Sequence, residues 1–222
     1  MTFDPAWLPR LAHGLQVTLS VVAASIAIGF GIGILLAIGR VYAPRPIRWL
    51  CAAYIQFFRG TPLLVQLMIV YFGLPTWGIT LSAFSSAILA FGLNTAAYQA
   101  EYFRGAIQAV RGGQMMAARS VGMSFRQAVV LIVLPQALRI VIPSWSNELI
   151  LMLKYSSIAF AITLLDLMGQ AKRIAGREFM YFEIYLVVAA YYLALVFIVS
   201  QLLRLLERRV AIPGLGAPGE SR

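Results

Sequence analysis

The chain has 222 residues, of which 61% are hydrophobic and only 12% charged, and its formal net charge is +10. A soluble domain of this size cannot bury so much apolar surface, so the composition excludes a soluble globular protein. The apolar runs do not alternate like the strands of an outer-membrane barrel, and they predict an all-α integral membrane protein. The arginines cluster between these runs, which favours membrane orientation and contact with anionic membrane lipid over nucleic-acid binding.

The first predicted span, 14–39, carries no charge and is long enough to cross about 30 Å of hydrocarbon. Within it Ser25, Gly29 and Gly33 recur every four residues, and such a ridge of small residues lets a second helix approach closely. The following segment, 40–48, contains three arginines and no acid. That bias predicts a cytoplasmic loop, and it places the N-terminus outside.

The second predicted span, 49–74, is interrupted by Arg59, with Gly60 and Pro62 directly after it. This pattern predicts a kinked or broken helix, and a costly charge at the break suggests a functional role. The third predicted span, 81–104, is polar in its second half, where Asn94, Tyr98 and Gln99 occur. At its end Glu101 and Arg104 are three residues apart and can pair on one helix face.

A surface segment, 111–127, is predicted next, because it is rich in arginine and is divided by Gly122. A short helix should precede this glycine turn, and Ser124 can cap a second helix after it. Both helices are expected to lie on the cytoplasmic membrane surface.

The fourth span is predicted at 128–153, with a break before a short apolar piece that ends near residue 165 and returns to the outer face. An external segment, 166–183, and a last span, 184–207, follow. The prediction is one domain, 1–210, with five transmembrane helices, an outside N-terminus and a cytoplasmic C-terminus. Residues 211–222, rich in proline and glycine, are predicted to form a flexible tail.

Enzyme chemistry is weakly supported by this sequence. It contains no glycine loop followed by Lys-Ser or Lys-Thr, so we expect no ATP hydrolysis by this chain. No histidine, cysteine or acidic cluster has metal-ligand spacing, and the single histidine, His13, is too isolated for a catalytic set. We therefore expect a transport subunit with no metal or cofactor of its own. An ion-coupled secondary transporter or channel subunit is the alternative, with Glu101 or Glu148 as the relay acid.

Three segments resemble the permease subunits of ABC importers for polar amino acids, of the histidine and glutamine type. They are a loop motif formed by Ala117, Ala118 and Gly122 with Ile132-Val133-Leu134-Pro135, the run Phe58–Gln66, and Asn94–Tyr98 with Glu101 and Arg104. Two positions depart from the family pattern. Met116 occupies the place of a glutamate, and Lys154-Tyr155-Ser156-Ser157-Ile158 stands where Lys-Asp-Thr-Ser-Leu is usual.

The resemblance covers about residues 15–209 and implies a type I importer permease fold in the bacterial cytoplasmic (inner) membrane. It implies three kinds of partner: a second permease subunit, the same or different, two cytoplasmic ABC ATPases that hold ATP and Mg, and an external substrate-binding protein. It further implies that a coupling helix docks in a groove of the ATPase. The coupling residues would be Met116, Ala117, Ala118, Arg119, Gly122 and Met123.

An imported amino acid is a zwitterion, so its site needs partners for a carboxylate and an ammonium group. We expect Arg59 and the backbone N–H groups near Gly60 and Thr61 to meet the carboxylate. Further polar contacts are expected from Gln66, Asn94, Ser156 and Ser157. The alternative is that Arg59 snorkels, or pairs with Glu101 or Glu148 as a purely structural contact.

Overall fold

The structure is a computed structural model that describes residues 7–110 and 112–210. The described residues form helices and no strand, which confirms the all-α prediction. In chain order these are α1 (Trp7–Tyr42), α2 (Arg45–Gly60), α3 (Leu63–Met68), η1 (Ile69–Gly73), η2 (Leu74–Trp77), α4 (Ala83–Ala109), α5 (Gly112–Ser120), α6 (Phe125–Gln127), η3 (Ala128–Val133), α7 (Leu134–Tyr155), η4 (Ser156–Ile162), α8 (Leu167–Glu178) and α9 (Tyr181–Val210).

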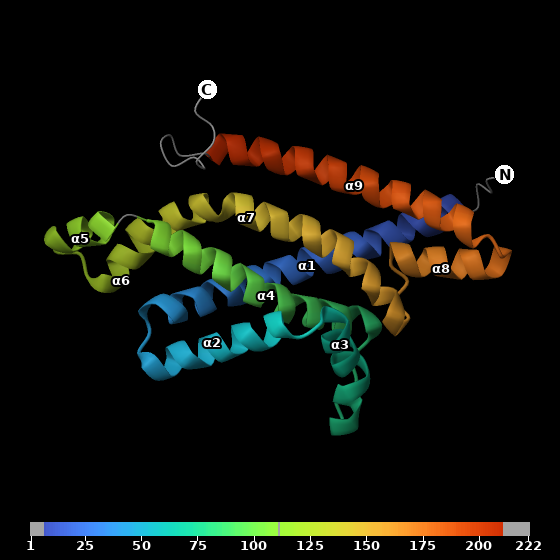
Figure 1. Ribbon diagram of the computed structural model, residues 1–222, viewed down its shortest axis with the longest axis horizontal. Coiled ribbons are helices and arrows are strands. Elements are labelled where there is room, and N and C mark those ends of the chain that lie inside the picture. Colours follow the sequence, from blue (N-terminus) through green and yellow to red (C-terminus); the bar gives the residue numbers. More distant parts are fainter. Residues whose placement is uncertain (1–6, 111, 211–222) are drawn as a thin grey trace.

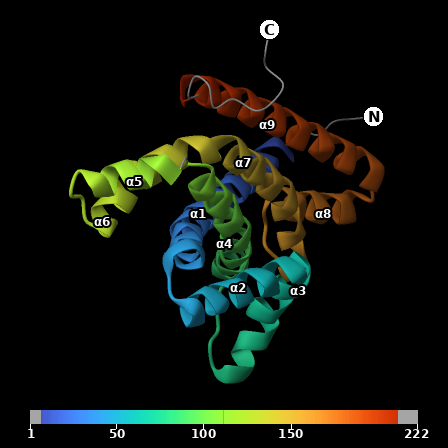
Figure 2. The ribbon, with the colours of Figure 1, turned by 60° about the vertical axis from the view of Figure 1, so that its left-hand side comes forward.

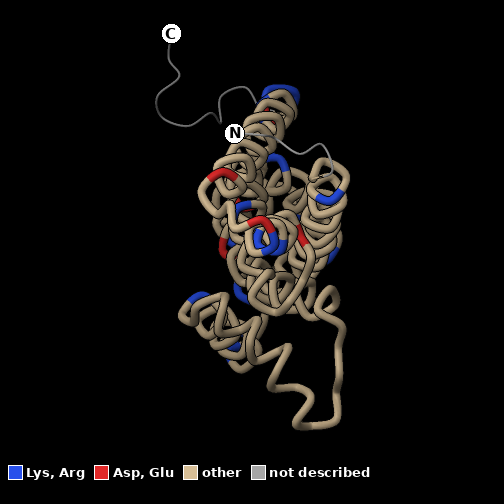
Figure 3. Tube along the Cα trace, turned by 90° about the vertical axis from the view of Figure 1, so that its right-hand side faces the viewer, with Lys and Arg blue, Asp and Glu red and all other residues tan. Residues whose placement is uncertain are grey.

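The long helices α1, α4, α7 and α9 extend along the long axis of the molecule (Figure 1). Helix α4 packs against both α1 and α7, while α9 contacts α7 and α8. The short helices α5 and α6 lie at one end of the molecule, and α8 lies at the other, beside the start of α1 (Figures 1 and 2). The α3–η2 region projects to one side of the bundle, and Figure 3 shows that it carries no charged residue.

The ridge of small residues on α1 is the contact surface for α4, as predicted. The Ser25 hydroxyl donates to the carbonyl of Ile88 at 3.4 Å. A Cβ added at Gly29 would collide with the side chain of Thr95, and one added at Gly33 would lie 3.0 Å from the Cβ of Gln99. The two helix backbones therefore approach closely only because these positions lack side-chain bulk.

The predicted break after Arg59 is confirmed, since α2 and the α3–η2 segment meet at an angle of 101°. Pro62 has no N–H to continue α2, so carbonyl groups at the end of α2 need other donors. The Gln66 amide donates to Phe58 O at 2.9 Å and to Thr61 O at 3.0 Å. The Asn94 amide of α4 donates to the same Phe58 O at 3.1 Å, which ties the break to the bundle.

Three helical stretches are long and apolar enough to cross a membrane: Trp7–Tyr42, Phe125–Ile162 and Tyr181–Val210. The bent pair Arg45–Gly60 and Leu63–Trp77 counts as a fourth if it forms one span. Helix α4 has 27 residues but does not join this group, because Asn94, Gln99 and other polar residues interrupt its apolar sequence. Five spans therefore remain a prediction.

Three boundaries differ from the sequence-based expectations. Helix α1 begins at Trp7 rather than at residue 14, because Trp7 and Leu11 are buried with α8 and α9. The break expected after residue 153 is absent, because α7 continues directly into the 3-10 helix η4, which ends at Ile162 before Thr163, whose φ is +64°. The segment predicted to be external, 166–183, contains a helix, α8, that was not predicted. The predicted tail, 211–222, lies outside the described residues.

Candidate functional site

A cavity of about 410 Å³ opens where α2 ends, between α4, α7 and η4. The end of α2 and the break after it contribute Arg59, Gly60 and Thr61. The walls are completed by polar residues of two further helices, with apolar side chains between them. The polar wall residues are Asn94, Tyr98, Tyr102, Glu148 and Tyr155. The predicted residues Arg59, Gly60, Thr61 and Asn94 are therefore brought together at one cavity.

Arg59 is the cationic group of this cavity. Its guanidinium carbon lies 5.3 Å from the centre of the Tyr98 ring, and the side chain is exposed. Within residues 7–110 and 112–210, no carboxylate lies within 4.0 Å of it, because the one ion pair is Glu101–Arg104 at 2.7 Å. Arg59 therefore does not form the structural ion pair with Glu101 or Glu148 that the sequence left open.

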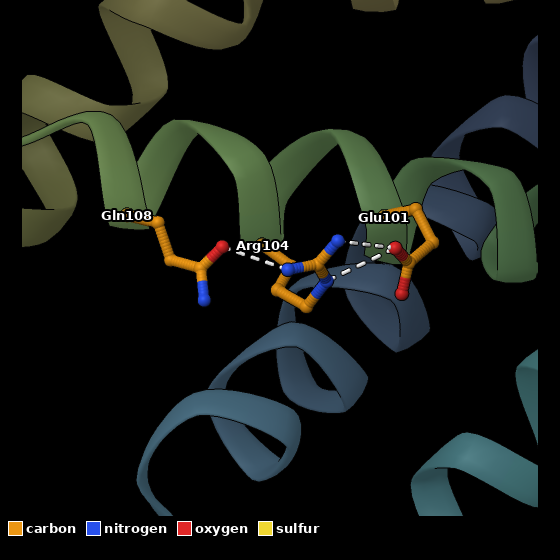
Figure 4. Close-up of polar contacts among 3 residues, drawn as sticks. All are labelled: Glu101, Arg104 and Gln108. Carbon is orange, nitrogen blue, oxygen red and sulfur yellow. Dashed lines mark hydrogen bonds and ion pairs between the residues drawn. The ribbon is translucent and has the colours of Figure 1, made fainter.

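Glu101 is instead held by its own helix (Figure 4). The Arg104 guanidinium donates to Glu101 Oε2 through Nε at 2.9 Å and Nη2 at 2.7 Å, and through Nη1 to the Gln108 amide oxygen at 2.7 Å. The predicted pairing of Glu101 with Arg104 is confirmed. Because Glu101 is bound in this way, it adds no free carboxylate for Arg59.

Glu148 supplies the carboxylate of the cavity, and its side chain is only 4% exposed. Its Oε1 accepts a hydrogen bond from Thr95 Oγ1 at 2.6 Å, and its Oε2 accepts one from the Tyr102 hydroxyl at 3.4 Å. Behind Thr95 the Gln99 amide donates to Thr95 Oγ1 at 3.2 Å and accepts from Trp145 Nε1 at 3.1 Å. This chain of bonds across α4 and α7 fixes the carboxylate at the cavity wall.

Glu148 was not among the predicted binding residues, although the sequence held a signal for it. An acid within an apolar span is costly, so it marks a functional position by default. From the sequence, Glu148 was expected only as a relay acid or as a partner of Arg59. The cavity tyrosines Tyr98, Tyr102 and Tyr155 gave no such signal, because tyrosine is frequent at membrane interfaces and in helix contacts.

Three other predicted residues lie outside the cavity lining. Gln66 is 5% exposed, and its amide carbonyl accepts from Asn94 Nδ2 at 3.0 Å while its NH₂ group holds the α2–α3 break. The Ser156 hydroxyl donates to Leu153 O at 2.7 Å, and the Ser157 hydroxyl donates to Lys154 O at 2.8 Å. Their part in substrate binding stays a prediction, and in this structure their hydrogen bonds go to helix carbonyls and to the turn.

A second cavity, of about 400 Å³, adjoins the first along α2. Arg59 lines both cavities. The second cavity also receives Arg40 from the end of α1, Gln56 from α2 and Glu101 from α4. Arg59 therefore connects the cavity at the α2–α3 break with a second, partly polar cavity that extends toward the end of α1.

The segment α5–α6 has the local structure that its sequence predicts. Gly122 adopts a left-handed φ of +86°, and α5 ends with hydrogen bonds from Gly122 N to Arg119 O at 3.1 Å and from Met123 N to Ala118 O at 3.1 Å. This is the hydrogen-bond pattern of a glycine-terminated helix. Ser124 caps the next helix, with its hydroxyl accepting from Gln127 N at 3.3 Å.

The side chains of this segment divide into an inner and an outer set. Ala118 is 6% exposed, whereas Phe125 is 46% exposed and lies edge-on to the Tyr42 ring of α1, with the two ring centres 5.2 Å apart. Met116 is 70% exposed and Val121 79% exposed, while Ala117 and Arg119 are also exposed. The Arg119 guanidinium donates to Met123 O at 3.0 Å, which closes the turn. An apolar surface is thus presented outward at one end of the molecule.

The fold and this site define a membrane-embedded subunit of a transport system. The chain belongs to the family described as binding-protein-dependent transport system inner membrane components, whose model matches residues 29–212. It is a permease subunit of an ABC importer, with the type I permease fold. Its relatives are described as components of ABC transport systems, so nothing here supports the ion-coupled alternative.

The individual comparisons agree with one another. A probable amino-acid ABC transporter permease, YckA of Bacillus subtilis, is 40% identical over 203 residues, which cover 91% of this chain and 90% of the relative. A probable glutamine permease of the same organism, GlnM, is 39% identical and covers 89% of this chain and 91% of its own length. A crystal structure of an amino acid ABC transporter with histidines is 39% identical, with a TM-score of 0.86 over 94% of this chain and 100% of that one.

Proposed function

We propose that the chain translocates an amino acid and that the 410 Å³ cavity binds its zwitterionic group. The observation that supports this proposal is a cavity that combines a buried carboxylate with an arginine that forms no ion pair within the described residues. Arg59 would bind the substrate carboxylate, and Glu148 would bind the ammonium group. The volume falls within the range of about 300–1,000 Å³ that is usual for small-molecule sites. The descriptions of the relatives, amino-acid and glutamine permeases, support this substrate class.

The path inward would follow Arg59 into the second cavity, where Arg40 and Gln56 continue the polar surface. This direction fits a chain whose N-terminus lies outside and whose α1–α2 turn lies in the cytoplasm, since Arg45 and Arg48 follow that turn directly at the start of α2. A second permease subunit, identical or different, would complete the wall on the side where Arg59 and Tyr155 are exposed.

The α5–α6 segment would dock on a cytoplasmic ATPase, which would bind ATP and Mg. Its outward apolar residues Met116 and Val121 support an interface buried against a partner. Met116 would make an apolar contact where the family has a glutamate. Closure of the ATPases would then move the spans as a unit and switch access from outside to inside.

The test is amino-acid uptake into proteoliposomes that contain this chain with its ATPase, its binding protein and any second permease. Arg59→Ala is expected to abolish ATP-dependent uptake while the assembled complex still elutes as one species. Glu148→Gln should weaken uptake at least about tenfold, because a charge-assisted bond to the substrate becomes a neutral one. Arg45→Ala is the matched control, since it removes a charge from the same helix outside both cavities.

Normal uptake by Arg59→Ala would contradict the site assignment. Uptake by the unmodified complex that ignores ATP and follows an ion gradient would contradict the ABC mechanism as a whole.

A further inference from the structure

A second basic site lies at the end of the molecule opposite α5 and α6, in the region that faces the viewer in Figure 3. A pocket of about 430 Å³ is formed there between the start of α1 and helix α8. Its lining consists of Arg10 from α1 and Gln170, Arg173 and Arg177 from α8. Three guanidinium groups thus converge on one pocket without an acidic residue in its lining.

The packing of α8 explains how these residues come together. Leu167, Ala171 and Ile174 are buried against α1 and α9, which fixes the rotation of α8. Positions 170, 173 and 177 are three and four residues apart, so they lie in one row on the helix surface. Gln170 is 6% exposed at the base of this row, and both arginines of α8 are exposed above it.

The neighbouring charges do not neutralise the pocket. Lys172 is directed to a different neighbour, since its Nζ lies 5.0 Å from the centre of the Phe160 ring in η4. In the part of the chain that the structure describes, no carboxylate lies within 4.0 Å of the three pocket arginines. The pocket therefore keeps a concentrated positive charge that an anionic partner would relieve.

Membrane orientation does not account for these arginines. Under the proposed topology this end of the molecule lies on the external side of the membrane, where the positive-inside bias disfavours Lys and Arg near the spans. It is also the end at which a binding protein must deliver its substrate, as the family description requires a binding protein.

We propose that Arg10, Arg173 and Arg177 form the acceptor for acidic side chains of the substrate-binding protein. The inference rests on the proposed function for its topology. Each guanidinium can bind a carboxylate with two parallel hydrogen bonds, which fixes the orientation of the docked protein. The concentrated charge also accelerates encounter, so docking depends on ionic strength.

The experiment measures stimulation of ATP hydrolysis by the purified cognate binding protein, with the complete complex in nanodiscs of phosphatidylcholine. The double variant Arg173→Glu with Arg177→Glu should raise the KM for the binding protein at least about tenfold, because like charges then face each other. The maximal rate should stay within about twofold, because the docked complex is the same at saturation. Added salt should raise the wild-type KM and should affect the variant less.

Two further variants separate docking from damage to α8. Lys172→Gln removes one positive charge from the same helix outside the pocket lining, and its KM should stay close to that of the wild type. Arg10→Glu changes the pocket from α1, so a raised KM in this variant reports the pocket even if the α8 variant fails to assemble.

A wild-type KM in both the α8 double variant and Arg10→Glu would overturn the proposal. So would an effect that appears only in nanodiscs with anionic lipid, because the pocket would then be a headgroup site. Failure of the proposed function is distinguishable from either result, because it would appear as normal uptake by Arg59→Ala or as uptake that ignores ATP, and neither is read from the KM for the binding protein.

Discussion

The α1–α4 contact and the α5–α6 segment differ in whether their side chains are buried within the chain or exposed at its surface. In the contact, Gly29 and Gly33 bring two helices together, and Thr95 and Gln99 of α4 hydrogen-bond to Glu148 and to the carbonyl of Ile26. In the segment, short helices are shaped by local devices, a left-handed glycine and a capping serine, and they present Met116 and Val121 outward. One region is completed by contacts within this chain, whereas the other would be completed by a partner under the proposed function.

This difference predicts whether a substitution should change the stability of the fold or its coupling to the ATPase. Changes in the α1–α4 contact should cost stability, because the buried groups have no alternative partners. Changes in the α5–α6 segment should leave the bundle intact and alter communication with the ATPase. Three substitutions test this contrast.

The largest effect is expected from Gly29→Leu, which would place a side chain against Thr95 and Gln99. Overpacking of this kind should cost about 3 kcal/mol or more, and the helices would have to separate. We expect loss of the folded protein, measured as recovery of monodisperse complex after detergent extraction. Gly31→Leu is the control on the same helix, because a Cβ at Gly31 would meet nothing within 4 Å. Equal recovery of both variants would contradict the packing described.

An intermediate effect on stability is expected at Asp166, which caps α8. This cap is buried, whereas the comparable cap Ser124 of α6 is exposed. Asp166 Oδ1 accepts from Gly169 N at 2.9 Å, and the residue is 1% exposed. Burial raises the pKa of the Asp166 carboxyl to about 7 from 3.8. The folded state therefore binds this proton more tightly than the unfolded state does. The stabilisation is complete below the unfolded pKa, and it is lost as the pH rises toward the folded pKa.

Thermal unfolding of the solubilised protein measures this dependence. The wild type should be about 2 to 3 kcal/mol less stable at pH 8 than at pH 5 through this one group. Asp166→Asn keeps a side-chain oxygen for the cap and cannot titrate, so its profile should be flatter over this range. Parallel pH profiles for the two proteins would show that Asp166 does not titrate as described.

The smallest effect on stability is expected from Gly122→Val, where a β-branched residue would adopt the φ of +86°. The strain should amount to about 1–2 kcal/mol, confined to the turn. ATP hydrolysis should become uncoupled from uptake, while the Tm of the complex changes little. Gly113→Val is the control in α5, because an added Cβ there would meet nothing within 4 Å and no positive φ is involved. Normal coupling in Gly122→Val would show that the turn is not required.

The sequence by itself determined the features that depend on neighbours along the chain. Pro62 after Arg59 breaks the second helix because proline lacks an N–H. Gly122 turns the chain because glycine adopts a positive φ without strain. Ser124 caps α6 through its own hydroxyl. The composition likewise required helices, since lipid offers no hydrogen bonds to an open backbone.

The tertiary structure decided which polar side chains face a cavity. Gln66 and Asn94 are both polar residues in apolar surroundings, yet Gln66 is used to hold the α2–α3 break while Asn94 also lines the cavity. Glu148 lies at the same cavity as Arg59 although 89 positions separate them in the sequence. Whether side chains of different helices line the same cavity depends on the rotation of these long helices about their axes. That rotation is set by packing between distant segments, which local sequence patterns do not contain.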